Sequence, residues 1–166
     1  MKNEPKIKVE TKETELIISR EFDAPRELAF AAFSSCEHLK RWWGPKEWPM
    51  KECKLDFKVG GRWHYCLRGP KEGDESWGVG IYREIEKPDK IVWEDYFSDK
   101  DGNISEGMPG GIMTAEFIEK NGKTTIISHS KYSEKSDLDK VLEMGMVEGL
   151  TSSQDRLEEY LLSVKK

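Results

Sequence analysis

The chain has 166 residues, of which 36% are hydrophobic and 36% charged, with a formal net charge of -5. This profile is typical of one soluble globular domain with a heavily charged exterior. An acidic chain without a basic run is a poor match for nucleic-acid binding, because phosphate neutralisation dominates that affinity. The longest apolar runs are a few residues, so we also expect no membrane span.

The N-terminus mixes charges and carries no apolar signal segment. The three cysteines, Cys36, Cys53 and Cys66, are odd in number, and no two form a CxxC pair. With no secretion signal visible, we expect reduced thiols and a cytoplasmic location. Residues 1–13 are predicted to be a loose polar tail, followed by a single domain over residues 14–166.

A strand and two short helices come first. Residues 14–22 predict a strand, because their apolar residues alternate. Residues 23–34 predict a helix that has a proline in its first turn and a buried stripe of alanine, leucine and phenylalanine. A second short helix follows, with Leu39, Trp42 and Trp43 at i, i+3 and i+4 on one face. The Gly-Pro pair after Trp43 ends it. We expect one of these two tryptophans in the core and the other, Trp43, at a cavity wall.

The middle of the chain predicts a run of antiparallel strands. Residues 51–59 alternate almost strictly between apolar and charged side chains, which is typical of a strand with one buried face. Gly60-Gly61 and Asn121-Gly122 are hairpin signals. The further strands are predicted over residues 62–68, 77–85, 90–97, 112–119 and 124–132. The polar loop 98–111 is either a lid over a pocket or simply a long hairpin connection.

The C-terminal third predicts a long amphipathic helix from Ser136 to Val164, weakened or bent at Gly145 and Gly149. Its apolar stripe needs a partner, and the only large apolar face available is that of the sheet. The sequence therefore predicts an α+β helix-grip fold: a curved antiparallel sheet of six to seven strands wrapped around the C-terminal helix. The two short helices lie between the first two strands.

Four segments of the sequence resemble a known family. They are EFDAPRELAFAAFSSCEHLKRWWGP, FKVGGRWHYCLRGP, IEKPDKIVWED and GMVEGLTSSQDRLEEYL. Together, from about residue 14 to 162, they resemble the activator-of-heat-shock-ATPase-homologue branch of the START/birch-pollen-allergen-like (SRPBCC) superfamily. The resemblance implies the helix-grip fold and a deep, largely apolar cavity between sheet and helix. It implies no single activity, since the superfamily includes lipid and hormone carriers, polyketide cyclases and co-chaperone domains.

The concave face of the predicted sheet is rich in aromatic and methionine side chains. An ordinary core is the alternative, but large aromatics on a curved sheet that face a small helix residue can enclose space. Methionine adapts to irregular ligands. We therefore expect a hydrophobic ligand, lipid-, polyketide- or flavonoid-like, bound by Trp43, Phe57, Trp63, Tyr65, Trp77, Trp93, Met113, His129, Met146, Leu150 and Ser153.

His129 is the main candidate for chemistry in this set. If its strand face is concave, the imidazole is a polar anchor or a general base; otherwise it is a hydrogen-bonded strand histidine. His64 is expected to face outward. The solvent-facing side of the strands is favoured for four further charged residues, which are otherwise candidates for a cavity rim: Arg83, Glu84, Glu94 and Asp95.

No residue is assigned as catalytic. The sequence has no GxSxG elbow, no phosphate loop and no zinc-ligand spacing, so we expect no metal and no cofactor. The primary prediction is a monomeric carrier or sensor for a hydrophobic small molecule. One alternative is a co-chaperone that stimulates the ATPase of the 90-kDa heat-shock protein in a stress response. The other is a cyclase- or hydrolase-type enzyme that uses His129 with a cavity tyrosine.

Overall fold

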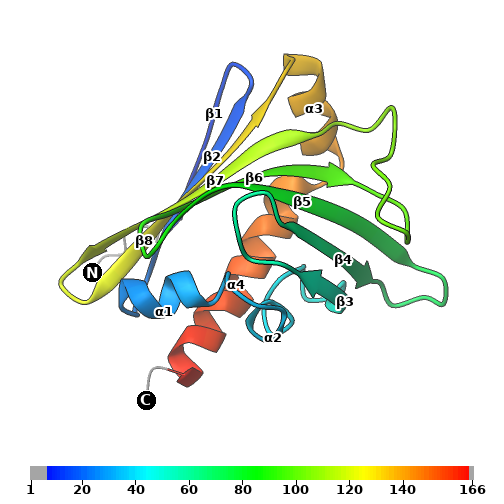
Figure 1. Ribbon diagram of the computed structural model, residues 1–166. Coiled ribbons are helices and arrows are strands. Elements are labelled where there is room, and N and C mark those ends of the chain that lie inside the picture. The colour runs from blue at the N-terminus through cyan, green and yellow to red at the C-terminus, as the bar shows by residue number, and fades with distance from the viewer. Residues whose placement is uncertain (1–6, 165–166) are drawn as a thin grey trace.

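The computed structural model describes residues 7–164, which form one eight-stranded antiparallel sheet and four helices (Figure 1). The strands are β1 (Ile7–Lys12), β2 (Glu15–Phe22), β3 (Met50–Leu55), β4 (Arg62–Arg68), β5 (Glu75–Glu86), β6 (Lys90–Phe97), β7 (Gly111–Lys120) and β8 (Lys123–Tyr132). The helices are α1 (Arg26–Ala31), α2 (Cys36–Leu39), α3 (Lys135–Glu143) and α4 (Met146–Val164). The strand order is β1-β2-β8-β7-β6-β5-β4-β3. This is the predicted α+β helix-grip class, with slightly more strands than expected.

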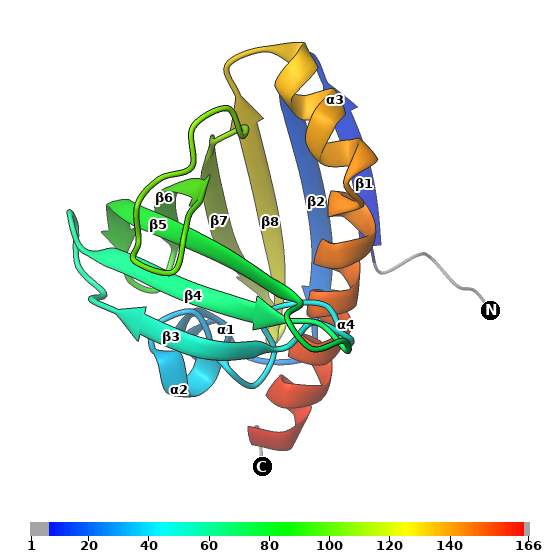
Figure 2. The ribbon, with the colours of Figure 1, turned by 90° about the vertical axis from the view of Figure 1, so that its right-hand side faces the viewer.

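The sheet curves around α4, which crosses its concave side (Figures 1 and 2). The two short helices α1 and α2 connect β2 to β3, and both views place them beside the C-terminal half of α4. Leu157 and Leu161 of α4 are buried in the main hydrophobic core with residues of α1, α2 and the sheet. The open side of the sheet is therefore closed by helices at one end.

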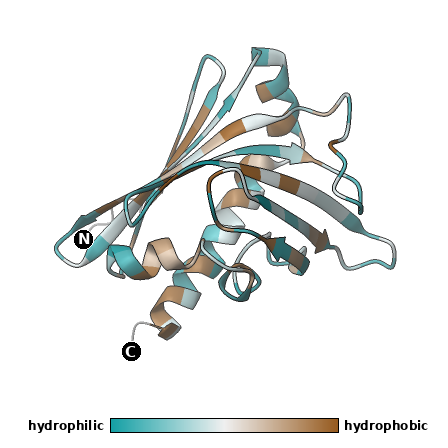
Figure 3. Cartoon of the chain, viewed as in Figure 1, coloured by the Kyte–Doolittle hydropathy of each residue, from teal (hydrophilic) through white to brown (hydrophobic). Residues whose placement is uncertain are grey.

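Strand alternation decides which side chains face α4. On β2, Leu16, Ile18, Arg20 and Phe22 are all at most 7% exposed, and hydrophobic and hydrophilic residues alternate visibly along the strands (Figure 3). Arg20 is the polar member of this buried row. Its guanidinium donates to Asp155 Oδ1 at 2.8 Å and to Glu158 Oε1 at 3.2 Å, and both carboxylates lie on α4. The buried guanidinium of Arg20 thus links β2 to α4 through two ion pairs.

The predicted N-terminal tail is wrong for residues 7–12, which form β1 and pair with β2 in antiparallel register. β1 is an edge strand, and five of its six residues are exposed; Ile7 packs against the buried cluster that contains Leu16 and Ile18. Ile7 and Val9 alternate with charged residues, but two apolar positions in a strongly charged segment are too few to distinguish a strand from a polar tail. Residues 1–6 of the predicted tail lie outside the described part of the chain.

The predicted long C-terminal helix is two helices, α3 and α4, and Gly145 separates them. Gly145 has φ of +89°, a left-handed conformation that glycine adopts without a Cβ penalty. The amphipathic spacing continues across this break, which explains why the pattern predicts one helix. The break places Met144, Gly145 and Met146 at the wall of a pocket that Pro109 and Tyr132 also line.

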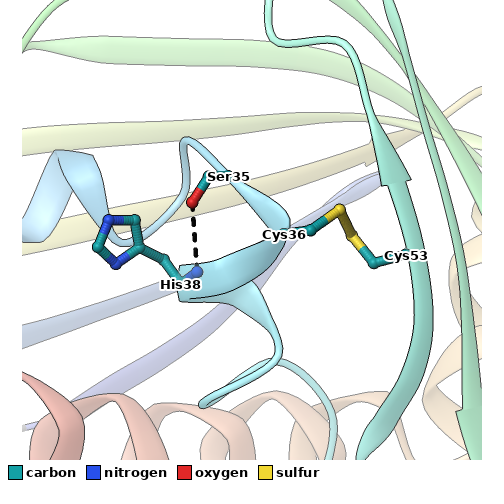
Figure 4. Close-up of a disulfide and its surroundings, with 4 residues drawn as sticks. All are labelled: Ser35, Cys36, His38 and Cys53. Atoms are coloured by element: carbon teal, nitrogen blue, oxygen red, sulfur yellow. Dashed lines mark hydrogen bonds between the residues drawn. A yellow bond between two sulfur atoms is a disulfide. The ribbon is translucent and has the colours of Figure 1, made fainter.

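The expectation of three reduced cysteines is wrong for two of them. Cys36 of α2 and Cys53 of β3 form a disulfide, 17 positions apart in the sequence, while Cys66 is free and buried (Figure 4). Ser35, next to this bond, caps α2 by accepting from the His38 backbone N–H at 3.3 Å. The predicted cytoplasmic location loses the support that reduced cysteines gave it. No helix within residues 7–164 is long and apolar enough to cross a membrane.

Reduction of the Cys36–Cys53 bond should lower the free energy of unfolding by about 2–4 kcal/mol, because it frees a loop of moderate length in the unfolded chain. Urea unfolding with and without a reducing agent measures the difference. Cys66→Ser is the control, since it keeps the disulfide and should show the same response to reductant. Equal urea midpoints for oxidised and reduced protein would contradict the structural role of the bond.

Candidate ligand-binding site

A largely apolar cavity, called the inner cavity below, lies between the concave face of the sheet and α4. The space open to the centre of a water-sized sphere is about 80 Å³. That is room for several waters or one small ring. Its walls include seven of the predicted residues, Trp43, Trp93, Met113, His129, Met146, Leu150 and Ser153, and also Phe33, Trp42, Asp95, Thr114, Ala115, Ile126, Ser128, Ser130, Gln154 and Leu157.

The inner cavity adjoins a wider opening, the outer pocket, where α3 meets α4. The outer pocket has about 290 Å³ by the same measure, and its other walls include Pro109, Tyr132 and Met144. The two spaces share three residues, Asp95, Met113 and Met146. These three residues therefore mark the neck between the outer pocket and the inner cavity.

Trp42 and Trp43 both contribute to the walls of the inner cavity, but only Trp42 is also fully buried in the core. Trp42 is only 2% exposed, and its indole Nε1 donates to the Ala32 carbonyl at 2.9 Å. Trp43 is half-buried, and its ring centroid lies 4.8 Å from that of Trp63 and 6.5 Å from that of Trp93, both in edge-to-face geometry. Such contacts fix the ring orientation. The Trp43 side chain is thus held as a rigid wall of the inner cavity.

The turn that presents Trp43 is held by α4. Arg156 Nη1 donates to the Gly44 carbonyl at 2.8 Å and to the Trp43 carbonyl at 3.3 Å. His38 Nδ1 lies 2.7 Å from the Tyr160 hydroxyl, one helical turn further along. The RWWGP and DRLEEYL segments, far apart in the sequence, are therefore in direct contact. Arg156 was not among the predicted site residues, although it lies inside one of the segments that carry the family resemblance.

Four of the predicted ligand-binding residues do not line the inner cavity. Phe57 packs against Phe30 and Tyr82 in the core, with ring centroids 6.0 and 5.2 Å away. Trp63 and Tyr65 face the concave side but are buried against Trp43 and Trp93 instead. These large rings fit because β5 places glycine opposite them: a Cβ at Gly78 would lie 2.7 Å from the Tyr65 ring. They fill space that the prediction left to a ligand.

Trp77 is the fourth, and it lies on the opposite, convex face. Its ring stacks on His64 with centroids 5.0 Å apart, and its Nε1 donates to Glu75 Oε1 at 3.0 Å. Because neighbouring Gly78 faces the concave side, Trp77 must point away from it. The outward position predicted for His64 agrees with this stacking.

His129 is also on the convex face. It pairs with Thr114 in the sheet, while the next pair, Ser128 and Ala115, faces the cavity. The imidazole Nδ1 lies 3.5 Å from Glu15 Oε1, and its Nε2 lies 3.9 Å from Glu116 Oε1. His129 therefore borders the inner cavity only through its backbone. The hypothesis that it is an anchor or a general base in the cavity is wrong, and the enzyme alternative loses its candidate base.

The loop 98–111 lies mainly on the convex side, as Figure 2 shows where it crosses β5. The Gly102 carbonyl accepts from Arg62 Nη2 at 3.2 Å, and the Asp99 carbonyl lies 3.1 Å from His64 Nε2. Pro109 borders the outer pocket, but no residue of the loop lines the inner cavity. The loop is thus no lid over the inner cavity.

Asp95 faces into the cavity, contrary to the prediction of a solvent-facing carboxylate. Its neighbours in the sheet register are Gly80 and Gly111, which have no side chains to contact it. Its Oδ1 is buried and accepts no hydrogen bond from a group of the described chain. Burial raises the pKa of this carboxyl from 3.8 to about 7, and the nearby Trp93 indole N–H acts in the opposite direction. The signal that sequence reasoning missed is Trp93, two positions earlier on the same strand face.

Gln154 is a second polar group that the sequence did not single out. It is 6% exposed on α4, lines the inner cavity, and its Oε1 has no hydrogen-bond partner. With Asp95, it gives the cavity two unpartnered side-chain oxygens among mainly aromatic and aliphatic walls. An enclosed apolar space with a few buried polar groups is the usual form of a small-molecule site.

Comparisons with known proteins agree with this architecture. Residues 23–162 match the family model described as activator of Hsp90 ATPase homolog 1-like protein. A crystal structure from Mycobacterium smegmatis is 27% identical, with a TM-score of 0.84 over 93% of this chain and 94% of that one. A solution structure from Arthrobacter aurescens is 27% identical, with a TM-score of 0.89 over 96% of this chain and 93% of that one. One from Staphylococcus epidermidis is 29% identical, with a TM-score of 0.79 over 93% of both chains. No curated protein is a significant match.

Proposed function

Because the chain belongs to the activator of Hsp90 ATPase homolog 1-like family, and thus has the SRPBCC-type helix-grip fold, we propose that it binds a hydrophobic small molecule between the sheet and α4, as a carrier or sensor. The observation that carries this proposal is the inner cavity itself. Its walls are mostly aromatic and aliphatic, and Trp43 is fixed there by the disulfide-linked α2 region and by Arg156. Apolar area removed from water would supply most of the binding free energy.

The size of the two spaces limits the ligand. The inner cavity suits a single ring, whereas a lipid-, polyketide- or flavonoid-like molecule would have to extend through the neck into the outer pocket. Met113 and Met146 form part of this neck, and methionine side chains adapt readily to ligands of different shape. A ring in the inner cavity with a substituent at the neck is the arrangement that the geometry favours.

Ser153→Leu should fill the inner cavity and weaken binding of a one-ring probe, 2-phenylethanol, at least tenfold. Ser153 is 5% exposed on α4 and lines the cavity, so the added carbons take the space of the ring. Titration followed by amide NMR shifts gives the Kd. Overpacking costs about 1–3 kcal/mol of stability, so thermal unfolding should confirm that the variant is still folded at the titration temperature.

Ser163→Leu is the matched control for this titration. It makes the same change on α4 at an exposed position outside the cavity, and it should leave probe binding unchanged. Equal Kd values for wild type and a folded Ser153→Leu variant would show that the probe does not bind in the inner cavity.

Stimulation of an Hsp90 ATPase is the alternative that the family description suggests. An ATPase assay with the Hsp90 of the source organism separates the two functions. Stimulation that survives Ser153→Leu would favour the chaperone role, because that substitution acts only inside the cavity. Absence of any stimulation at tens of micromolar would remove it.

A further inference from the structure

We propose that the cavity selects a small aromatic ligand that carries a protonated amine, with the ring in the inner cavity and the ammonium group held by the Asp95 carboxylate at the neck. This inference rests on the proposed function and adds to it the charge of the ligand and the residue that recognises it. The evidence is the position of Asp95, the hydrogen-bonding capacity of the walls and the absence of a countercharge around the carboxyl.

Asp95 is placed where a substituent on a bound ring would emerge. It belongs to the walls of both the inner cavity and the outer pocket, together with Met113 and Met146. A ligand whose ring occupies the inner cavity therefore has its polar end beside Asp95. Gly80 and Gly111, its register partners on β5 and β7, place no side chain against the carboxyl.

The cavity contains buried hydrogen-bond acceptors that receive no hydrogen bond from the described chain. Among its described lining residues, the buried side-chain oxygens without a partner are Asp95 Oδ1 and Gln154 Oε1. Trp93 Nε1 is the one buried donor among these lining residues without a partner at full hydrogen-bond geometry, and it lies close enough to the Asp95 carboxyl to lower its pKa, so this carboxyl faces one neutral donor and no cation of the described chain. An ammonium group brings three N–H donors and no acceptor. Buried acceptors that lack a donor cost free energy, so a ligand that supplies donors is favoured.

No cation of the described chain faces Asp95. The titratable groups that couple to it are the phenols of Tyr65 on β4 and Tyr132 on β8. Burial raises the pKa of both phenols, and the Asp95 charge raises it further, so both stay neutral. Val141 of α3 faces the outer pocket, and α4 contributes only uncharged residues to both spaces. The positive partner of this carboxylate would therefore come with the ligand.

The aromatic walls favour the same ligand charge. Trp43 and Trp93 both line the inner cavity, and an indole face attracts a nearby cation through its ring quadrupole. A carboxylate ligand would meet the reverse situation, because it would place a second negative charge beside Asp95 in a largely apolar space. A neutral alcohol can donate only one hydrogen bond to the carboxyl. The geometry thus ranks the amine first, the alcohol second and the acid last.

Three probes with the same ring test this ranking: 2-phenylethylamine, 2-phenylethanol and phenylacetate, titrated by calorimetry and amide NMR at pH 8. The amine should bind at least ten times more tightly than the alcohol, and the acid should not bind measurably. Asp95→Asn should abolish the preference for the amine while the Kd of the alcohol changes less than threefold. Asp101→Asn, which removes an exposed carboxylate from the loop 98–111, is the matched control and should behave as wild type.

A second readout is the pH dependence of the amine Kd. Since the free carboxyl has a pKa of about 7, its ionised fraction falls about tenfold between pH 8 and pH 6, and the amine should weaken by about the same factor. The probe amine stays protonated over this range. The alcohol, and the amine with Asp95→Asn, should show no such pH dependence.

The outcomes separate this inference from the proposed function. If amine and alcohol bind wild type equally and Ser153→Leu weakens both, the cavity binds ligands but Asp95 does not select their charge. If the amine preference persists in Asp95→Asn, another group recognises the ammonium and the inference is wrong. If none of the probes binds at millimolar concentration, the inference and the proposed function both fail.

Discussion

Asp95→Asn should raise the free energy of unfolding at pH 8 by up to about 4 kcal/mol and leave it nearly unchanged near pH 4. The folded-state pKa of the carboxyl is about 7, against 3.8 in the exposed state. Between these values the folded protein holds a proton that the unfolded chain has lost. Stability contributed by this group is therefore complete at low pH and is lost as the pH rises to about 7, at about 1.4 kcal/mol per pH unit. Asparagine does not ionise and avoids this loss.

Urea unfolding of wild type and Asp95→Asn at several pH values between 4 and 8 measures the effect. The difference between the two proteins should grow from near zero at pH 4 to its plateau above pH 7, because titration of the other carboxyls is common to both. Asp101→Asn should show no comparable growth. A variant no more stable than wild type at pH 8 would mean that Asp95 is paired or solvated in solution.

The expected gain also bears on function. A buried carboxylate without a positive partner destabilises the empty protein, and residues of this kind are found where stability is exchanged for binding or activity. Asp95→Asn should therefore give a more stable protein that has lost its preference for an amine. Both effects come from the same buried oxygen, Oδ1.

Trp42→Ala should lower the free energy of unfolding by about 3–5 kcal/mol, the range for a large aromatic residue removed from a core. Trp42 is 2% exposed, its ring centroid lies 4.8 Å from that of Phe33, and its indole donates to the Ala32 carbonyl. The substitution leaves a cavity in the core and an unpaired carbonyl on the segment that links α1 to α2.

Trp43→Ala is the informative comparison, because it removes the same side chain from the next position. Both side chains line the inner cavity, but Trp43 is only half-buried and lacks the hydrogen bond that Trp42 makes to Ala32, so the loss of Trp43 should cost less stability. It should also enlarge the inner cavity enough to admit a two-ring probe such as 2-naphthol. Urea unfolding and the same NMR titration measure both effects. Equal loss of unfolding free energy in the two variants, with no binding of 2-naphthol by Trp43→Ala, would contradict the different positions assigned to these tryptophans.

Most of the fold was predictable because alternation and helical spacing reflect burial directly. The strand residues from β2 to β8 and the C-terminal stripe all report which side chains meet the core. β1 was not predicted because Ile7 and Val9 are its only apolar residues, and so short an alternation within a charged segment does not distinguish a strand from a polar tail. The Cys36–Cys53 bond escaped because it joins α2 to β3 through their three-dimensional arrangement, which no spacing in the sequence reveals.

The site was less predictable because it depends on which face of each strand is concave. His129 and Trp77 were assigned to the wrong face, and the register of β5 and β8 decides both. Asp95 was expected to face solvent because charged strand residues usually do. Trp93, two positions earlier on the same strand face, is a large aromatic residue that indicates a buried face for Asp95 as well, and this signal outweighs that expectation. Burial of Trp63 and Tyr65 depends on the close approach allowed by Gly78, which sequence spacing does not measure.

The most direct test of the central claim, a ligand in the cavity between the sheet and α4, uses the methionine methyl groups. Methyl NMR during titration with 2-phenylethylamine should shift the signals of Met113 and Met146, which line the inner cavity and the neck. Met50, which is buried in the core away from the cavity, and Met108, on the exposed loop, should not move. Shifts confined to Met108, or saturation without any change at Met113 and Met146, would contradict the claim.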